Sequence, residues 1–225
     1  MEEKGRIEYV LFDLDETMYS KENGLMELVS QRISDYMSER MGIDPETVSE
    51  LRREYYERYG TTGRGLFLHH DLDQEDYFTF VHDLPVEDFL KPDERLDRML
   101  RDLSAGKSIF TNATAEHARR VLRALGIERH FDRIIGIRDL ECIPKPDIRA
   151  YQKVLKLLNA RPEECVLVED RVRNLIPGKE LGMTTVLIGN QRVAEGADFI
   201  VEDVTEVGEV VHRIRSGESG PRPQP

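Results

Sequence analysis

The segment RIEYVLFDLDET, residues 6–17, constrains the fold of this chain more than any other stretch. Residues from Ile7 to Phe12 form a nearly continuous β-branched and aromatic run, which predicts a buried central strand. Asp13 and Asp15 follow where that strand should end, and Thr17 comes two residues later. Ligands bind at the carboxyl ends of strands in open α/β sheets, so two carboxylates at this place suggest chemistry. The alternative is that Asp15 or Thr17 only caps a helix or turn.

The size and charge of the chain limit the classes of function that suit it. A length of 225 residues with 39% hydrophobic residues fits one compact domain, or a core with a smaller insertion. The formal net charge of −12 disfavours nucleic acid or an anionic membrane surface as a partner, because both would be repelled at long range. An anionic substrate would therefore need local positive charge or a metal ion.

Neither the cysteines nor the N-terminal residues favour a secreted protein. Cys142 and Cys165 give no disulfide framework and no zinc-site spacing, so we expect both to be buried packing residues. The first ten residues lack a long apolar segment with a cleavage site, and no run of about 18 apolar residues occurs. We expect a cytoplasmic protein that is a monomer or a homodimer.

The apolar pattern is helical after the first strand. Gly42 and Gly60 should end the first two helices, and residues 61–65 are expected to form a loop. The helices predicted from apolar spacing are residues 25–41, 45–59, 74–81 and 93–103. Because no convincing strand occurs here, we predict that residues 18–92 form an all-helical insertion, a natural lid over the end of the first strand.

From residue 107 onward strands and helices alternate, which predicts right-handed βαβ units and a parallel sheet. Strands are expected at residues 107–112, 132–137, 165–170, 184–189 and 198–201. Helices are expected at residues 114–125, 147–158, 174–181, with Pro177 in the first turn, and 204–214. We therefore predict a doubly wound α/β core made of residues 1–17 and 93–215, followed by a disordered tail, residues 216–225.

Polar side chains follow several of these strands, and this architecture should bring them to one crevice. Thr111 and Asn112 end the second strand, before a helix N-terminus that favours an anion. Lys145 lies between two prolines in a later loop, and Glu169 and Asp170 end the fourth strand. With the two acids of the first strand they form a carboxylate-rich pocket. Oxygen ligands with little nitrogen or sulfur favour Mg²⁺.

Four motifs thus lie in a fixed order: DLDET at residues 13–17, Thr111 with Asn112, Lys145, and Glu169 with Asp170. This set resembles the haloacid dehalogenase superfamily of phosphatases, over the core from Arg6 to about Ile214. The resemblance implies a Rossmann-like core, an aspartyl-phosphate intermediate and Mg²⁺ as the cofactor. The helical insertion is similar to the first type of cap in that superfamily.

The resemblance assigns a role to each motif residue. Asp13 would be the nucleophile, and Asp15 would protonate the leaving alkoxide and then deprotonate water, so Asp13 has to be ionised and Asp15 protonated. Lys145 would offset the negative charge, while Thr111 and the amide of Asn112 would donate to phosphate oxygens. The implied metal ligands are Asp13, the backbone carbonyl of Asp15, and Asp170. Glu169 and Asn174 would either support these ligands or bind the metal themselves.

The insertion more narrowly resembles the pyrimidine 5′-nucleotidase branch. The segments YYERYGTTGRGL, HHDLDQEDY and HDLPVEDFLKPD carry this resemblance, which implies a small phosphorylated metabolite, a nucleoside 5′-monophosphate, as the substrate. Arg64, between two glycines, and His69 are the candidates for contacts with that substrate. His69, His70 and His82 fit solvated loop positions equally well.

Two departures and several alternatives accompany the resemblance. Arg171 stands where the family often has a small residue, so it either crowds the crevice or adds charge, and Glu169 stands where Asp or Gly is usual.

A receiver-like signalling domain is disfavoured by the length, the insertion and Asp15, and a dehalogenase would lack Asp15. A sugar-phosphate phosphatase or phosphomutase is the second candidate. A non-catalytic phosphate-binding or regulatory relative would be expected to have lost Asp13 or Asp15.

Overall fold

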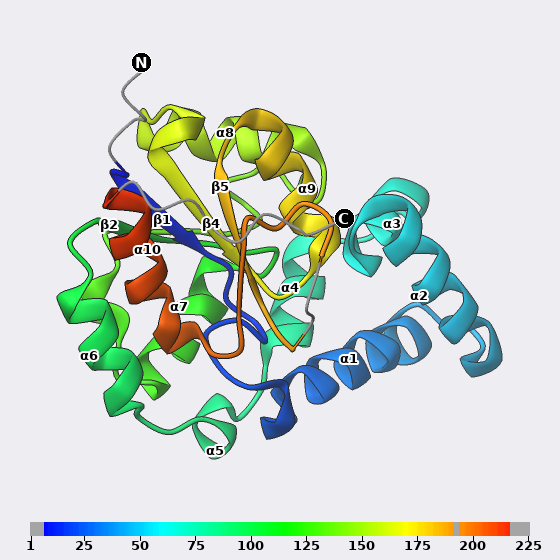
Figure 1. The fold of residues 1–225 in the computed structure, drawn as a ribbon. Coiled ribbons are helices and arrows are strands. Elements are labelled where there is room, and N and C mark those ends of the chain that lie inside the picture. The colour runs from blue at the N-terminus through cyan, green and yellow to red at the C-terminus, as the bar shows by residue number, and fades with distance from the viewer. Residues whose placement is uncertain (1–6, 191–193, 217–225) are drawn as a thin grey trace.

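The computed structural model describes residues 7–190 and 194–216, and its centre is a six-stranded sheet in the order β3-β2-β1-β4-β5-β6 (Figure 1). All neighbouring strands are parallel. The strands are β1 (Tyr9–Phe12), β2 (Gly106–Phe110), β3 (Arg133–Ile135), β4 (Cys165–Glu169), β5 (Thr184–Ile188) and β6 (Phe199–Val201). The predicted doubly wound parallel sheet is confirmed. The disorder expected for residues 217–225 falls outside the described residues.

Helices cover both faces of this sheet, as Figure 1 shows. Alternate side chains of β1 point to opposite faces, so Val10 and Phe12 join one apolar cluster while Leu11 joins another. The first cluster packs under α6 (Glu94–Asp102), α7 (Ala115–Ala124) and α10 (Val207–Arg215). The second packs under α8 (Ile148–Leu158) and α9 (Val172–Leu181). Burial on both faces explains why β1 is apolar without alternation.

The helices between β1 and α6 form the insertion, and the first three of them extend to one side of the sheet (Figure 1). They are α1 (Leu25–Asp35), which continues as a π-helical turn over Tyr36–Arg40, α2 (Pro45–Tyr59), α3 (Thr62–His69), α4 (Gln74–His82) and the short α5 (Val86–Phe89). A third apolar cluster lies among them and includes Met37, Tyr55 and Leu66. The first half of α1 instead joins the sheet cluster through Leu25 and Val29. The short α5 joins the same cluster through Val86, so the insertion has its own core and shares α5 and the first half of α1 with the sheet.

The loop prediction for residues 61–65 is wrong, because α3 begins at Thr62. Thr61 caps this helix by accepting a hydrogen bond from the amide of Arg64. A Cβ at Gly65 would lie 2.2 Å from a ring carbon of Tyr55, and one at Gly63 would lie 3.0 Å from the ring of Tyr77. These glycines therefore allow close packing of helices rather than a turn.

Two further predictions need smaller corrections. The helix expected at residues 174–181 begins at Val172, so Pro177 lies inside α9 rather than in its first turn. Residues 86–89, for which no element was predicted, form the helical turn α5. Among the described residues, no helix is both long and apolar enough to cross a membrane.

Candidate active site

The ends of the central strands bring the predicted polar residues together. Asp13 follows β1, Thr111 follows β2 and Glu169 ends β4, and these three strands are neighbours. Phe12 pairs with Val168 in the register, and the amide of Asp13 donates to the carbonyl of Val168 at 2.9 Å. The backbone ladder therefore continues to the first acid. This fixes Asp13 at the edge of the sheet where the other strands end.

Lys145 is the centre of this group. Its Nζ donates to Asp13 Oδ1 at 2.7 Å, to Glu169 Oε1 at 2.6 Å and to the carbonyl of Phe110 at 2.8 Å. All three ammonium protons are used, and the residue is 1% exposed. Burial disfavours the charged amine, but the two carboxylates outweigh it and raise the pKa of Lys145. Lys145 is therefore a fixed positive charge between two acids.

Asn112 holds the backbone that carries this lysine. The amide of Lys145 donates to Asn112 Oδ1 at 2.8 Å, and Asn112 Nδ2 donates to the carbonyl of Lys145 at 3.1 Å. The neighbouring hydroxyl, Thr111 Oγ1, accepts from the amide of Ala113 at 3.0 Å. An accepting hydroxyl keeps its own proton, so Thr111 can still donate to a phosphate oxygen. The role of the Asn112 side chain in placing Lys145 was not predicted.

Three acids lie close enough together to hold one cation. Asp13, Glu169 and Asp170 each offer a carboxylate oxygen, and these atoms lie within 4.8 Å of one another. Burial, Glu169 and Asp15 raise the pKa of Asp13 to about 7 against the effect of Lys145. Burial, Glu169 and Asp13 raise the pKa of Asp170 to about 8. An oxygen-only donor set with unfavourable negative charge fits a hard divalent cation such as Mg²⁺.

Glu169 is better placed to support Lys145 than to bind a cation directly. Its Oε1 accepts from Lys145 and, at 2.8 Å, from Asn174 Nδ2. Its Oε2 accepts from the amide of Arg171 at 3.1 Å. Both oxygens of this fully buried carboxylate are thus occupied. The same bonds place Asn174 beside Glu169, where the sequence predicted a supporting residue. The predicted contribution of the Asp15 carbonyl to a metal site stays a prediction.

Arg171 does not crowd the acids. Its guanidinium donates to Tyr56 OH at 2.9 Å and to Glu16 Oε2 at 2.8 Å. Its Nε lies 3.5 Å from Asp170 Oδ2. The nearby Arg173 donates to the carbonyl of Tyr56 at 3.1 Å. The start of α9 is therefore bonded to the last turn of α2, and Arg171 adds positive charge beside the third acid.

Asp15 lies among residues that the sequence did not single out. Its Oδ1 accepts from Tyr19 OH at 2.6 Å and lies 3.5 Å from His117 Nε2. The ring of His82 stacks on that of His117, with 4.5 Å between centroids. Burial lowers the pKa of His82 to about 3. His82 is therefore a partly buried neutral side chain in contact with α7, not a solvated loop residue.

In the protein without a cation, the surroundings of the two aspartates act against the protonation states that the sequence predicts. Burial acts to raise the pKa of Asp15, but His117 and Tyr19 outweigh it, so the pKa is lowered. The pKa of Asp13 is raised. The expectation of an ionised Asp13 and a protonated Asp15 is therefore not met by these groups alone. A cation at the three acids would favour the ionised form of Asp13.

Among the described residues, the two candidates in the insertion have their contacts with residues other than the acids and Lys145. The backbone of Arg64 is bonded to Thr61, and its charge acts on Cys142 and Asp147, near the loop that carries Lys145. The ring of His69 stacks on that of Tyr55, and its Nε2 forms a hydrogen bond with Tyr59 OH. A substrate contact by Arg64 or His69 stays a prediction.

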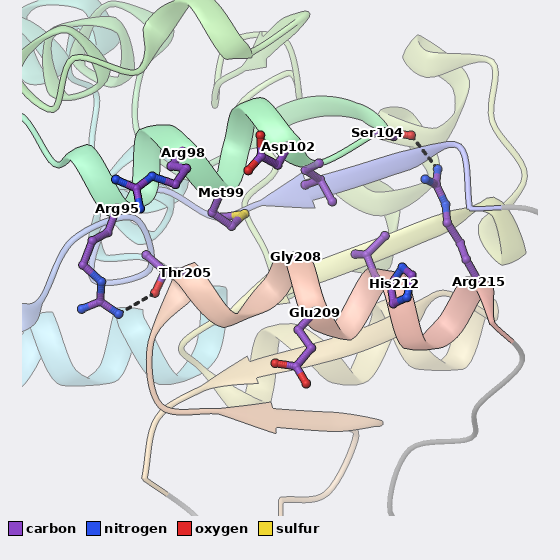
Figure 2. Close-up of a pocket in the computed structure, with 12 residues that line it drawn as sticks. Arg95, Arg98, Met99, Asp102, Ser104, Thr205, Gly208, Glu209, His212 and Arg215 are labelled. Atoms are coloured by element: carbon purple, nitrogen blue, oxygen red, sulfur yellow. Dashed lines mark hydrogen bonds between the residues drawn. The ribbon is translucent and has the colours of Figure 1, made fainter.

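A separate hollow of about 460 Å³ lies between α6 and α10, as Figure 2 shows. Arg95 bonds Thr205 at one end of it, and Arg215 bonds the carbonyl of Ser104 at the other. The residues that line it come from neither the strand ends with the acids nor the insertion. We therefore do not assign this hollow to the reaction.

Comparison with known proteins agrees with the class of enzyme that the sheet and its acids define. Residues 7–182 match the haloacid dehalogenase-like hydrolase family, which is more than half of the chain. The chain belongs to the haloacid dehalogenase-like hydrolase family. The prediction of a hydrolase is confirmed by this match, and phosphatases are among the named relatives.

Individual relatives differ in what their names describe. Phosphate metabolism protein 8 from Saccharomyces cerevisiae is 33% identical over 155 residues, which are 63% of this chain and 48% of that protein. The chain thus spans about half the length of that relative. Glyceraldehyde 3-phosphate phosphatase from Pyrococcus furiosus is 23% identical over 237 residues, covering 92% of this chain and 94% of that protein.

Solved structures with the same fold also belong to enzymes with different named activities. β-Phosphoglucomutase from Clostridium difficile matches with a TM-score of 0.62 at 19% identity, covering 94% of this chain and 98% of that chain. L-2-haloacid dehalogenase from Xanthobacter autotrophicus matches with a TM-score of 0.61 at 16% identity, covering 95% and 100%. At these identities the likeness concerns the fold alone.

Proposed function

We propose that this protein is a Mg²⁺-dependent phosphomonoester hydrolase in which Asp13 forms an aspartyl-phosphate. The observation that carries the proposal is the buried Lys145 bonded to both Asp13 and Glu169, next to Asp170. Thr17 Oγ1 also donates to Asp13 Oδ2 at 3.2 Å, so both oxygens of the nucleophile are oriented. This arrangement holds a carboxylate at the strand ends in a fixed direction, as a nucleophile requires.

The cation would be held by Asp13, Asp170 and the backbone carbonyl of Asp15. When bound, it would neutralise charge on the acids and on the phosphoryl oxygens. In the first step an oxygen of Asp13 bonds to phosphorus while the bond to the leaving oxygen breaks, and Asp15 gives that oxygen a proton. Asp15 has to be protonated when the substrate is bound, and the negative charge of a phosphate beside it favours that form over the ionised form that His117 and Tyr19 favour. In the second step water attacks phosphorus and gives a proton to Asp15, and the bond from Asp13 to phosphorus breaks. Asp15 therefore ends each cycle protonated again.

Lys145, Thr111 and the amide of Asn112 would stabilise the phosphoryl group. The ammonium of Lys145 offsets charge, and the free hydroxyl proton of Thr111 can donate to a phosphate oxygen. Helix α7 begins just after Thr111 and Asn112, with Thr114 as its cap, and a helix start favours an anion. Removal of one such donor typically raises the barrier by about 3 kcal/mol.

We propose that residues 18–92 act as a cap over the site, on a core of residues 1–17 and 93–215. Support comes from bonds between the insertion and the core, and one of the residues that make them, Arg171, lies beside Asp170. Arg171 and Arg173 bond Tyr56 at the end of α2. On the other side, Arg138 pairs with Glu75 at the start of α4. A cap held in this way can exclude water and select the substrate.

For the substrate we propose a nucleoside 5′-monophosphate, as in the pyrimidine 5′-nucleotidase branch. The segments of α2 to α5 that resemble that branch support this proposal. The alternative is a sugar-phosphate phosphatase or phosphomutase, and the glyceraldehyde 3-phosphate phosphatase among the relatives supports the first of these. A non-catalytic relative is less well supported, because Asp13, Asp15 and Lys145 are all present.

Release of inorganic phosphate from a substrate panel tests these proposals. We expect Mg²⁺-dependent turnover that EDTA abolishes and added Mg²⁺ restores, with UMP and CMP preferred over AMP, glucose 6-phosphate, glyceraldehyde 3-phosphate and pyrophosphate. Asp13→Asn should abolish turnover while the protein stays folded. A clear preference for a sugar phosphate would refute the nucleotidase proposal, and full activity of Asp13→Asn would refute the mechanism. A cytoplasmic location and a monomeric or homodimeric state stay predictions.

A further inference from the structure

The carboxylate of Asp15 has one oxygen in contact with protein donors and one without. Oδ1 accepts from Tyr19 OH at 2.6 Å and lies 3.5 Å from His117 Nε2. Within residues 7–190 and 194–216, no side chain or amide hydrogen-bonds to Oδ2. The side chain of Asp15 is 18% exposed, so it is not sealed in the core. The two oxygens therefore have different surroundings.

The buried ring of His117 has two nitrogens that make no hydrogen bond to any described residue. Its side chain is 1% exposed, and in the described part of the chain neither Nδ1 nor Nε2 has a hydrogen-bond partner. Leaving a buried polar group unpaired typically costs about 1–3 kcal/mol, so such a group needs an explanation. His82 stacks on one face of its ring, and the Asp15 carboxylate lies beside Nε2. The geometry aims His117 at Asp15.

Tyr19 approaches the same oxygen from another element. It lies six residues after Asp13, and its ring belongs to the apolar cluster under the sheet. The residue is 8% exposed, so the position of its hydroxyl is set by packing. A hydroxyl fixed in this way restricts rotation of the carboxylate to which it donates. Tyr19 and His117 thus meet at Oδ1 from the segment after β1 and from α7.

We propose that Tyr19 and His117 are positioning residues that hold Asp15 Oδ1 and leave Oδ2 to exchange a proton with the leaving oxygen and with water. This inference rests on the proposed phosphatase mechanism. As the bond from phosphorus to the leaving oxygen breaks, the proton on Oδ2 passes to that oxygen. As water attacks the aspartyl-phosphate, its proton returns to Oδ2. Neither Tyr19 nor His117 touches the reacting atoms, so they act only through Asp15.

The identity of the leaving group separates this role from a structural one. An alkoxide or phenoxide needs a proton as it leaves, whereas 4-nitrophenoxide is stable as an anion. If Oδ2 is misplaced, the first group should leave slowly and the second almost normally. A residue that only stabilises the fold would change both esters alike. The ratio kcat/KM reports the first irreversible step, so it isolates departure of the leaving group from hydrolysis of the intermediate.

The experiment compares phenyl phosphate with 4-nitrophenyl phosphate, two esters of similar shape, in the full-length protein with Mg²⁺. Tyr19→Phe should lower kcat/KM for phenyl phosphate by about tenfold or more, and for 4-nitrophenyl phosphate by less than about threefold. His117→Leu should act in the same direction. His117→Gln, which can place an amide donor near the position of Nε2, should recover most of the phenyl phosphate activity.

Tyr9→Phe is the matched control, because it removes a tyrosine hydroxyl at the opposite end of β1. It should leave both esters unchanged. An equal loss for both esters in Tyr19→Phe, or no loss, would overturn the positioning role even if His117→Leu failed to fold. A wild-type protein that releases phosphate from neither of these esters nor from any member of the substrate panel would instead refute the proposed function. The two failures are thus distinguishable.

Discussion

Replacing Lys145 with methionine should destabilise the protein and abolish its activity. Methionine has a similar length but no charge, so Asp13 and Glu169 would lose the ammonium that both now contact. Removing one partner from a buried ion pair typically costs about 3–5 kcal/mol, because the other charge stays buried and unpaired. Because Glu169 is fully buried and Lys145 is 1% exposed, we expect Lys145→Met to lower the free energy of unfolding by at least about 3 kcal/mol.

The loss should depend on the charge of Asp13, and a second substitution tests this. Asp13→Asn removes one of the two carboxylates that Lys145 neutralises, while Thr17 can still donate to the amide oxygen. In the Asp13→Asn, Lys145→Met double variant, we therefore expect about half of the lost stability to return. The two substitutions should show a coupling free energy of about 1–3 kcal/mol, as contacting groups do.

Urea denaturation followed by circular dichroism, in EDTA at pH 7.5, measures these free energies of unfolding. Lys153→Met is a suitable control, because it removes a lysine whose partner Glu141 is exposed, and exposed pairs contribute little. The reasoning fails if Lys145→Met costs less than about 1 kcal/mol, since that is the range of surface pairs. It also fails if the double variant is no more stable than Lys145→Met.

Three further outcomes follow from the site. In EDTA, stability should fall as pH rises from about 4 to about 8, because the folded pKa values of Asp13 and Asp170, about 7 and about 8, lie above the ordinary value of 3.8. The increase in Tm on adding Mg²⁺ should therefore grow from pH 5 to pH 8, and an increase that shrinks would contradict it. Asn112→Ala, which loses two hydrogen bonds to the Lys145 backbone, should cost about 1–3 kcal/mol in urea and lower kcat, whereas unchanged kcat would contradict its positioning of Lys145. Arg173→Ala should increase amide hydrogen exchange at the end of α2 and raise KM with little effect on Tm, and unchanged exchange would remove support for the cap contact.

Much of the sheet was predictable from the sequence, because its signals are local. A buried parallel strand is apolar on both faces, so β1 and β4 stand out as runs that end in acids. The polar residues after each strand could then be placed at one edge by topology alone. Helix starts with a capping side chain, such as Asp44 before α2 and Thr114 before α7, also carry a local signal in the sequence.

The misses arose where one residue type serves two purposes. Gly63 and Gly65 were interpreted as loop residues, but they allow Tyr77 and Tyr55 to pack against α3. That distinction depends on side chains from other helices, which local pattern does not contain. The predicted start of α9 was wrong because proline suits the first turn of a helix, whereas Pro177 is tolerated inside this one.

The surroundings of Asp15 were missed for a related reason. Tyr19 occurs in an apolar context and packs in the core, so its hydroxyl gives no separate signal in the sequence. His117 lies on the buried face of α7, where a histidine is usually a satisfied core residue. The useful signal would have been its place one turn after Thr114, at the helix start that faces the site. Only the structure shows that Tyr19 OH and His117 Nε2 both lie beside one oxygen of Asp15.

The charges of the site also explain why a divalent cation suits it. The three grouped acids, when ionised, carry three negative charges, and the single buried lysine carries one positive charge. Among these four groups two negative charges therefore remain, and they would repel a phosphate dianion in a buried site of low dielectric constant. Arg171 beside Asp170 offsets them only in part, because its guanidinium also pairs with Glu16. A divalent cation cancels them, whereas a monovalent cation leaves one. We therefore expect Mg²⁺ and a phosphate ester to bind with positive coupling, each tightening the other. Titration calorimetry with inorganic phosphate, which neither protein turns over, should therefore give a smaller coupling free energy in Asp13→Asn than in the wild type, because one of the three charges is gone.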